Sequence, residues 1–382
     1  MSKGTSSGLL DEVRSQSVFK HAILDSYFIP FVTMTTKWVA SKRVALLDGF
    51  AGRGRYPNGT PASGERMLLA ALKTKNVANV EVVLVEQEKS DFDNLAVVTE
   101  EYRQKGVTAA AFHGDVRDHL DGVVRQASGI PLFLFLDPCG ANVPYDTVER
   151  TLATDRRERR PATEALLNIS ADLTRRAAGA VNKGQHEHPI IARLNTMCGG
   201  EWWQQVALDA YTVSRDGTWE GAAEAVVNEY ARRIGEAAAM RAVVVPVRRQ
   251  VHHQPVYHLV FFTRAEHGLW VFADALALAR QTWMRLLGPD AEEAEGMLFN
   301  TVEAQIQGEQ ERSVAQIKQN MLDLVARRGR VKLVEHTLQI FGSAYGVAPE
   351  KFVRQAARAL QEAGSVQLDA KPKQVRDWHI WR

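Results

Sequence analysis

The chain has little cysteine, no long apolar run and almost no net charge. Only 2 of its 382 residues are cysteine, which excludes a disulfide framework and a four-cysteine zinc site. No stretch approaches membrane-spanning length, and residues 1–8 lack the apolar segment of a signal peptide, so we expect a cytoplasmic protein with no membrane attachment. The formal net charge of +2 does not itself indicate a nucleic-acid partner. Any such indication must come from where the charges lie.

What the chain does contain is a globular composition and a regular alternation of elements. Hydrophobic residues make up 45% and charged residues 24%, which is typical of a folded domain. Short apolar runs, separated by helix-length segments, occupy residues 44–47, 80–86, 108–115, 130–137 and 165–170. Such alternation predicts an α/β fold with a parallel sheet and right-handed crossovers.

The segment Leu47–Arg55 reads Leu-Asp-Gly-Phe-Ala-Gly-Arg-Gly-Arg. It places an acid at the end of the first strand and two glycines in the turn that follows. Glycine lets the backbone turn sharply and approach a ligand closely, and ligands of open α/β sheets bind outside the carboxyl ends of the strands. The pattern predicts an S-adenosylmethionine site of the class I methyltransferase type, formed by Asp48, Gly49, Phe50, Gly52 and Gly54. An ordinary glycine-rich turn remains open, whereas a dinucleotide site is disfavoured because Pro57 stands where its third glycine would be.

The ends of the next strands supply further acids in order. Glu86 could accept hydrogen bonds from the ribose hydroxyls, and Asp115 from the adenine amino group. Asp137 ends the most apolar strand and is followed by Pro138 and Cys139. A single acid at a strand end is usually a helix cap or turn former. Four in succession favour the cofactor site, with Asp137 also placed near the methyl acceptor.

The last two strands are expected at residues 242–248 and 257–263. Only eight residues join them, too few for a parallel crossover, so they should pair antiparallel. A reversed terminal strand distinguishes methyltransferase sheets from nicotinamide-binding ones. We therefore predict a Rossmann-like, seven-stranded methyltransferase sheet.

We expect three regions along the chain. Residues 1–40 form a helical preface that Pro30 interrupts. Residues 41–290 form the methyltransferase domain, with a tryptophan-containing helical insertion at 172–220 over the mouth of the site. Residues 309–382 predict three helices and a hairpin, the pattern of a winged helix-turn-helix domain. Arg354 and Arg358 lie on its would-be recognition helix, so it could contact a duplex, and a role in protein contact or dimerisation is equally open.

The chain also resembles the three-Cys-motif partner (TcmP) proteins of bacteria and their phages. The resemblance covers most of residues 18–290 and rests on Lys20-His-Ala-Ile-Leu24, Leu47–Tyr56, Leu84-Val-Glu86, Leu136-Asp-Pro-Cys-Gly140 and Glu201-Trp202. It implies a Rossmann-type methyltransferase fold and a partner protein that carries three cysteines. The family pattern usually has an aromatic residue after Asp-Pro, where this chain has Cys139.

The residues around Asp137 leave the methyl acceptor open. In enzymes that methylate the amines of bases, the acid is followed in the sequence by two prolines and an aromatic residue that stacks on the base. This chain lacks the second proline and the aromatic residue. Stacking would then fall to Tyr145 or an insertion tryptophan. Cys139 could instead act as the nucleophile of a carbon methylation, and a small buried cysteine without a catalytic role is the alternative.

Arginines cluster where a nucleic acid would need them. Candidate phosphate contacts are Arg156, Arg157, Arg175 and Arg176, although neighbouring acids also suit solvated faces. The histidines lack the partners of a metal site, and none is predicted. The sequence thus predicts an S-adenosylmethionine-dependent methyltransferase that acts on nucleic acid. The alternatives are a non-catalytic adaptor that docks nucleic acid for the three-cysteine partner, and methylation of a protein or small molecule.

Overall fold

The computed structural model describes residues 15–138, 143–214, 218–250, 252–287 and 301–382. Contacts divide the chain into two compact units, one holding Phe31–Arg264 and the other holding Ser17–Pro30 together with Ala265–Arg382. The helix that follows the last strand of the first unit, α10 (Glu266–Leu287), is therefore grouped with the carboxyl-terminal unit and not with the expected 41–290 domain. Cys139 lies outside the described residues.

The first unit is built on a seven-stranded sheet with the order β3-β2-β1-β4-β5-β7-β6. Strands β1 to β5 pair parallel, and β7 pairs antiparallel with both β5 and β6, which confirms the predicted reversed strand. The central runs form strands because they are buried on both faces: β4 is buried at every residue, whereas the edge strand β3 is only partly buried. The strands are β1 (Arg43–Asp48), β2 (Asn79–Glu86), β3 (Thr108–His113), β4 (Leu132–Leu136), β5 (Thr163–Ser170), β6 (Arg241–Val247) and β7 (Tyr257–Thr263).

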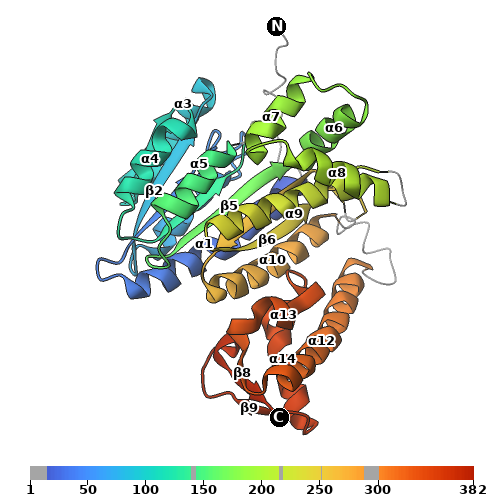
Figure 1. Cartoon of the computed structure of the whole chain (residues 1–382). Coiled ribbons are helices and arrows are strands. Elements are labelled where there is room, and N and C mark those ends of the chain that lie inside the picture. Colours follow the sequence, from blue (N-terminus) through green and yellow to red (C-terminus); the bar gives the residue numbers. More distant parts are fainter. Residues whose placement is uncertain (1–14, 139–142, 215–217, 251, 288–300) are drawn as a thin grey trace. The chain divides into compact units, whose positions relative to one another are not determined.

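Helices cover both faces of this sheet. One face carries the largest apolar core, in which Leu134 and Leu167 pack with residues of α4, α6 and α9, and Figure 1 shows α5 and α9 in front of β5. α2 and α3 pack on β2 and β3. The helices of this unit are α2 (Ser63–Thr74), α3 (Lys89–Gln104), α4 (Val116–Gln126), α5 (Tyr145–Glu149), a π-helix (Arg150–Asp155), α6 (Ala171–Asn182), α7 (Pro189–Cys198), α8 (Trp202–Val213), α9 (Glu220–Ala237) and the 3-10 turn Thr36–Trp38.

The second unit contains a smaller core of its own. Trp270, Phe341 and Trp378 are fully or almost fully buried there, and its strands form an antiparallel sheet of order β8-β10-β9. Besides α10, its elements are α12 (Thr301–Arg328), β8 (Val331–Lys332), α13 (Thr337–Phe341), α14 (Glu350–Glu362), β9 (Gln367–Asp369), β10 (His379–Trp381) and 3-10 turns at Leu333–His336, Gly342–Ala344 and Val375–Asp377. Among the described helices of either unit, none is long and apolar enough to cross a membrane.

The expected break at Pro30 is wrong. Pro30 lies inside α1 (Ser15–Thr35), which continues past it. Proline removes one backbone donor from a helix, a loss that burial of neighbouring side chains can outweigh. Phe28 before Pro30 and Phe31 and Val32 after it are all buried, and this burial holds the chain helical across the proline.

Candidate functional site

The floor of the candidate site is the junction between β1 and β4. Asp48, the last residue of β1, is fully buried, and its Oδ1 accepts a hydrogen bond from the backbone N–H of Phe50 at 3.1 Å. The N–H of Gly49 donates to the carbonyl of Phe135 at 2.9 Å. A Cβ at Gly49 would lie 2.7 Å from the Leu136 side chain. Only glycine therefore fits this position without displacing the end of β4.

The two loop glycines have different roles. Both adopt the left-handed conformation, with φ of +57° at Gly52 and +75° at Gly54. A Cβ at Gly54 would touch Leu95 of α3 at 3.0 Å, so this glycine permits close packing. A Cβ at Gly52 would meet no heavy atom within 4 Å. Open space therefore borders Gly52, where the sequence predicts the cofactor.

Glu86, at the end of β2, faces this loop. Its Oε2 accepts from the N–H of Gly52 at 2.8 Å, and its Oε1 accepts from the N–H of Glu88 at 2.7 Å. Burial raises the pKa of Glu86 above its usual range, and these two hydrogen bonds oppose the rise. Each carboxylate oxygen carries two lone pairs, so each can accept one further hydrogen bond. The arrangement suits two adjacent ribose hydroxyls.

A charged network anchors the loop. Arg55 donates to Glu65 of α2 at 2.5 and 2.8 Å and to Glu101 of α3 at 2.8 Å. The hydroxyl of Tyr102 also donates to Glu65, and burial and this carboxylate together raise the pKa of Tyr102 to about 12. Sequence analysis missed this role of Arg55. The available signal was an arginine at the end of the glycine segment, ten residues before an acid in the first turn of a helix.

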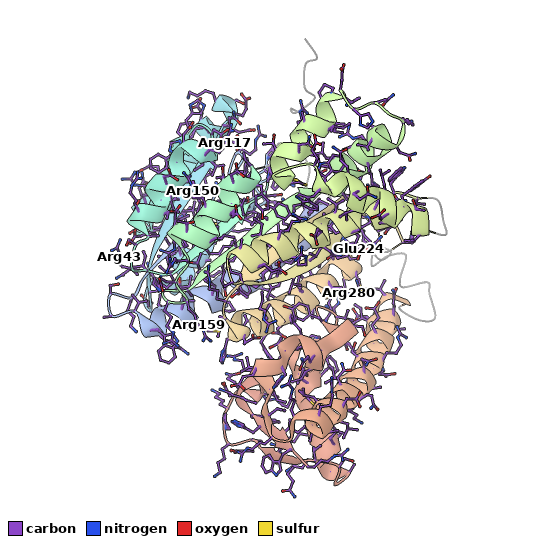
Figure 2. All side chains as sticks on the ribbon, in the orientation of Figure 1. Arg43, Arg117, Arg150, Arg159, Glu224 and Arg280 are labelled. Atoms are coloured by element: carbon purple, nitrogen blue, oxygen red, sulfur yellow. The ribbon has the colours of Figure 1, made fainter. Side chains whose placement is uncertain are left out.

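Asp115 is the N-cap of α4, and most of the acceptor positions of its carboxylate already receive hydrogen bonds. Its Oδ1 accepts from the backbone N–H and the Nε of Arg117, both at 2.9 Å, and its Oδ2 accepts from the Nη2 of Arg117 at 2.7 Å. The hydrogen bond with Arg117, which Figure 2 labels, lowers the pKa of Asp115. One acceptor position on Oδ2 is left for a ligand.

Asp137 follows β4 directly and is buried. Its Oδ1 accepts a hydrogen bond from Nδ2 of Asn168 on β5 at 2.5 Å. Asn168 is the second residue that sequence analysis missed, although it is the one polar residue in the run Ala165–Ile169. The pair places a carboxylate, held by an amide, at the carboxyl ends of two central strands.

A small cavity adjoins Asn168. The adjoining cavity measures only about 10 Å³, room for about one water molecule, and is lined by Leu136, Pro138, Val143, Leu167, Asn168, Ile169, Met197 and Tyr230. Met197 comes from α7 and Tyr230 from α9, which follows the expected insertion. Tyr145, named for base stacking, packs edge-on against Tyr230 with ring centroids 5.8 Å apart. Side chains of α7 and α9 thus enclose this small cavity.

The tryptophans of the expected insertion are buried, hydrogen-bonded or stacked on another ring. Trp203 is fully buried, and the indole N–H of Trp202 donates to the carbonyl of Cys198 at 2.7 Å. Trp219 stacks on Tyr211 with ring centroids 3.8 Å apart. Tyr211 thus covers one face of Trp219, and the guanidinium of Arg233 lies 4.4 Å from the ring centroid of Trp202.

Arg156 differs from its expected role. It is 7% exposed, and its guanidinium donates to the carbonyls of Ala127 and Ile130 at 2.7 and 2.8 Å and to the hydroxyl of Thr163 at 3.0 Å. These bonds join the starts of β4 and β5, so Arg156 has a structural role and is not part of an exposed arginine patch.

The other candidate arginines are more accessible. Arg157 is exposed beside Glu158, whereas Arg175 contacts the Asp172 carboxylate and Arg176 donates weakly to the Asp172 carbonyl at 3.4 Å. In the second unit, the guanidinium groups of Arg354 and Arg358 lie 5.0 and 4.9 Å from the Trp378 ring centroid. Within the described residues, no group of three or more His, Cys, Asp or Glu side chains could hold a metal ion.

Neither a protein-family model nor a curated protein matches the chain. Similar solved structures include the small RNA methyltransferase HEN1, with 10% identity, 62% of this chain and 25% of that chain covered, and a TM-score of 0.32. The methyltransferase domain of bacterial CtHen1 has 12% identity, with 63% of this chain and 99% of that chain covered and a TM-score of 0.30. M. jannaschii TYW2 in complex with AdoMet has 9% identity, with 61% of this chain and 71% of that chain covered and a TM-score of 0.26. The match thus spans a quarter of the HEN1 chain. Because these identities and TM-scores are low, a function can be inferred only from the geometry of the site.

Proposed function

We propose that this chain is an S-adenosylmethionine-dependent methyltransferase that acts on a base in nucleic acid. The observation that carries the proposal is the hydrogen bond from Gly52 to Glu86, beside open space at the carboxyl ends of β1 and β2. The strand order with a reversed β7 is the one expected for a methyltransferase sheet. Ligands of open α/β sheets bind at this edge.

Different residues of the chain would bind the cofactor and position the methyl acceptor. Glu86 would accept from the ribose hydroxyls, Asp115 would use its remaining acceptor position for the adenine amino group, and the glycine turn would let the backbone approach the ligand. The cofactor would supply an activated methyl group. Asp137, oriented by Asn168, would position the acceptor amine and take up its proton, since in-line transfer needs mainly positioning and proton removal.

The second unit is proposed to engage nucleic acid or a partner. Its order of helices and strands supports a winged-helix domain over residues 309–382. Among the described residues, no carboxylate pairs with Arg354, Arg358, Lys371 or Lys373. All of these side chains except Arg354 are exposed. Stacking on Trp378 holds the two arginines in place, which suits phosphate contact. A partner with three cysteines stays part of the proposal on the TcmP resemblance alone.

Calorimetry followed by methyl transfer tests the proposal. Wild type should bind S-adenosylmethionine at micromolar concentration, about 8 kcal/mol, and a Gly52→Val, Glu86→Ala variant should not. With labelled cofactor, label should enter RNA or DNA and not protein. Asp137→Ala should abolish transfer and keep cofactor binding, whereas Asp146→Ala, an exposed control, should retain both. Folded wild type that binds no cofactor contradicts the proposal.

A non-catalytic adaptor is the second candidate. The sequence after Asp137 favours it, because it lacks the second proline and the aromatic residue of enzymes that methylate the amines of bases. An adaptor would bind nucleic acid, with or without cofactor, and transfer no methyl group to RNA, DNA or protein.

A further inference from the structure

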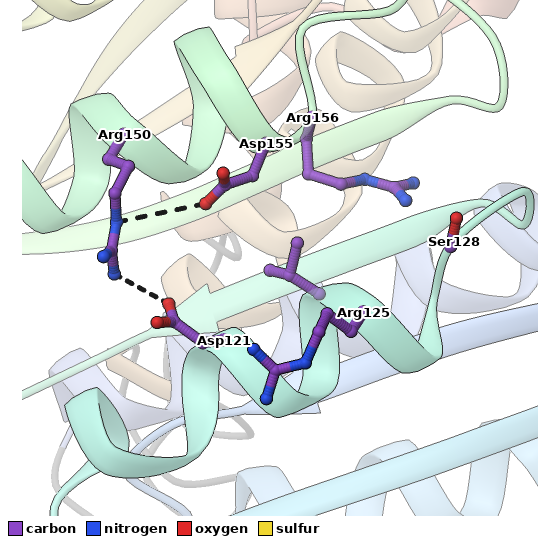
Figure 3. Close-up of a pocket in the computed structure, with 7 residues that line it drawn as sticks. Asp121, Arg125, Ser128, Arg150, Asp155 and Arg156 are labelled. Atoms are coloured by element: carbon purple, nitrogen blue, oxygen red, sulfur yellow. Dashed lines mark hydrogen bonds and ion pairs between the residues drawn. The ribbon is translucent and has the colours of Figure 1, made fainter.

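A cavity of about 490 Å³ opens in the first unit, away from the candidate cofactor site (Figure 3). Its lining is Asp121, Val124, Arg125, Ser128, Arg150, Asp155 and Arg156. Ser128 follows α4 and precedes β4, and Arg156 precedes β5, so the cavity lies toward the amino-terminal ends of these strands. The cofactor residues lie at the carboxyl ends. A volume of this size is ordinary for a small-molecule site.

A single arginine, Arg150, contacts both carboxylates of this cavity. Arg150 donates to Asp121 at 2.7 Å and lies 4.0 Å from Asp155, as the dashed lines in Figure 3 show. Arg125, one turn after Asp121 on α4, has no hydrogen-bond or ion-pair partner for its guanidinium among the described residues. Asp121 and Asp155 offset the charges of Arg125 and Arg150, so these four accessible side chains are neutral together, and the guanidinium of Arg125 is the one left without a partner.

The buried wall gives the lining its net positive charge, because Arg156 is the third arginine against two aspartates. Arg156 gives its hydrogen bonds to carbonyls and a hydroxyl, and no described carboxylate pairs with it. Arg264 donates to the Arg156 carbonyl at 2.9 Å. Burial, and to a lesser degree the charge of Arg264, lowers the pKa of Arg156 from its usual value. Arg264 thus adds a second positive charge behind the cavity, and the charge of Glu158 opposes the effect of burial on the pKa of Arg264.

We propose that this cavity binds a terminal phosphate group, carried by a free nucleotide or by the end of a nucleic-acid strand. A phosphate monoester carries up to two negative charges, and guanidinium groups bind it with paired hydrogen bonds. Arg125 provides such a donor pair, Arg150 provides the N–H groups that Asp121 does not use, and the Ser128 hydroxyl, which no described residue engages, provides another donor. Val124 is the one apolar side chain in the lining, so an apolar ligand is not suited. The site is independent of the cofactor proposal.

Calorimetry on the full chain tests this with uridine 5′-monophosphate, and with uridine as the control without phosphate. We expect submillimolar binding of the nucleotide and none of uridine. Arg125→Gln should weaken binding at least about tenfold, since it removes a charge-assisted donor pair. Arg159→Gln removes the same charge from a nearby exposed position outside the lining and should leave binding unchanged. Ser128→Asp should abolish binding by adding a negative charge, and Glu86→Gln should have no effect.

The source of the phosphate is separated by a second pair of probes, a short oligouridylate with a 5′-phosphate and the same strand with a 5′-hydroxyl. Tighter binding of the phosphorylated strand than of the mononucleotide identifies a nucleic-acid end, and equal binding identifies a free nucleotide. Equal affinity for uridine and its monophosphate, or an equal loss in Arg125→Gln and Arg159→Gln, overturns the proposal.

Discussion

The backbone N–H of Gly52 and the carboxylate of Glu86 are joined by a hydrogen bond of 2.8 Å, which connects the loop after β1 to the end of β2. The loop and the carboxylate therefore orient each other. Glu86→Gln replaces one acceptor oxygen with an amide donor, so either Gly52 or Glu88 loses its acceptor. We expect S-adenosylmethionine binding to weaken by about 1.5–3 kcal/mol, the range for hydrogen bonds to charged groups. Calorimetry beside Glu88→Gln, an exposed control, measures this; equal affinities for the two variants would contradict the assigned role.

A methyl group added at Gly49 should destabilise the fold. Its Cβ would lie 2.7 Å from Leu136 and 2.8 Å from Val116. Overpacking of this kind costs about 1–3 kcal/mol of unfolding free energy. Gly122→Ala is the matched control, because that Cβ would enter open space on α4, and it should stabilise by about 0.5–1 kcal/mol. Urea unfolding of both variants gives the comparison; a neutral Gly49→Ala would show that the end of β4 can move.

Loss of the Arg55 anchor should loosen the loop. Arg55→Met leaves the buried carboxylate of Glu65 without its guanidinium, and we expect a loss of about 2 kcal/mol, below the fully buried case because Arg55 is partly exposed. Arg103→Met, which breaks an exposed pair with Glu100 on α3, should cost less than about 0.5 kcal/mol. Denaturant midpoints test this difference, and cofactor affinity should fall in Arg55→Met alone. Matching midpoints would mean that the network contributes nothing.

His258 should make the first unit sensitive to acid. It is 1% exposed, and neither ring nitrogen has a hydrogen-bond partner among the described residues. Burial, with the charges of Arg248 and Arg175, lowers its pKa to about 4. At pH 7 the ring is neutral in both folded and unfolded chains. Below pH 6.5 only the unfolded chain gains the proton, so stability falls until about pH 4, by about 3 kcal/mol in total.

The variant His258→Leu should lose this part of the pH dependence and gain stability relative to wild type as the pH falls from 6.5 to 4. His252→Leu, at an exposed position, should keep the wild-type profile. Unfolding free energies measured at several pH values decide the matter. A His258→Leu profile parallel to wild type would assign the acid sensitivity to other groups.

Sequence predicted the features that depend on local pattern. Apolar runs ending in an acid located Asp48 and Glu86, and the eight-residue link located the antiparallel pair. It did not predict what depends on tertiary burial. Arg156 sits in a run of arginines that suggests an exposed patch, yet backbone carbonyls distant in sequence bury it. The role of Asn168 depends on its hydrogen bond to Asp137, which follows the adjacent strand and is distant in sequence. Pro30 is tolerated inside a helix because the residues around it are buried.

The antiparallel pairing of β5 with β7, in register from Glu164 with Thr263 to Ser170 with Tyr257, has a consequence for synthesis of the protein. The partner of β5 leaves the ribosome only after α6 to α9 have been made. Until then β5 presents an open edge of apolar residues, which can pair with other chains. Non-local strand pairing also forms slowly. We therefore expect chains that stop before Thr263 to aggregate, and the carboxyl half of the sheet to assemble last.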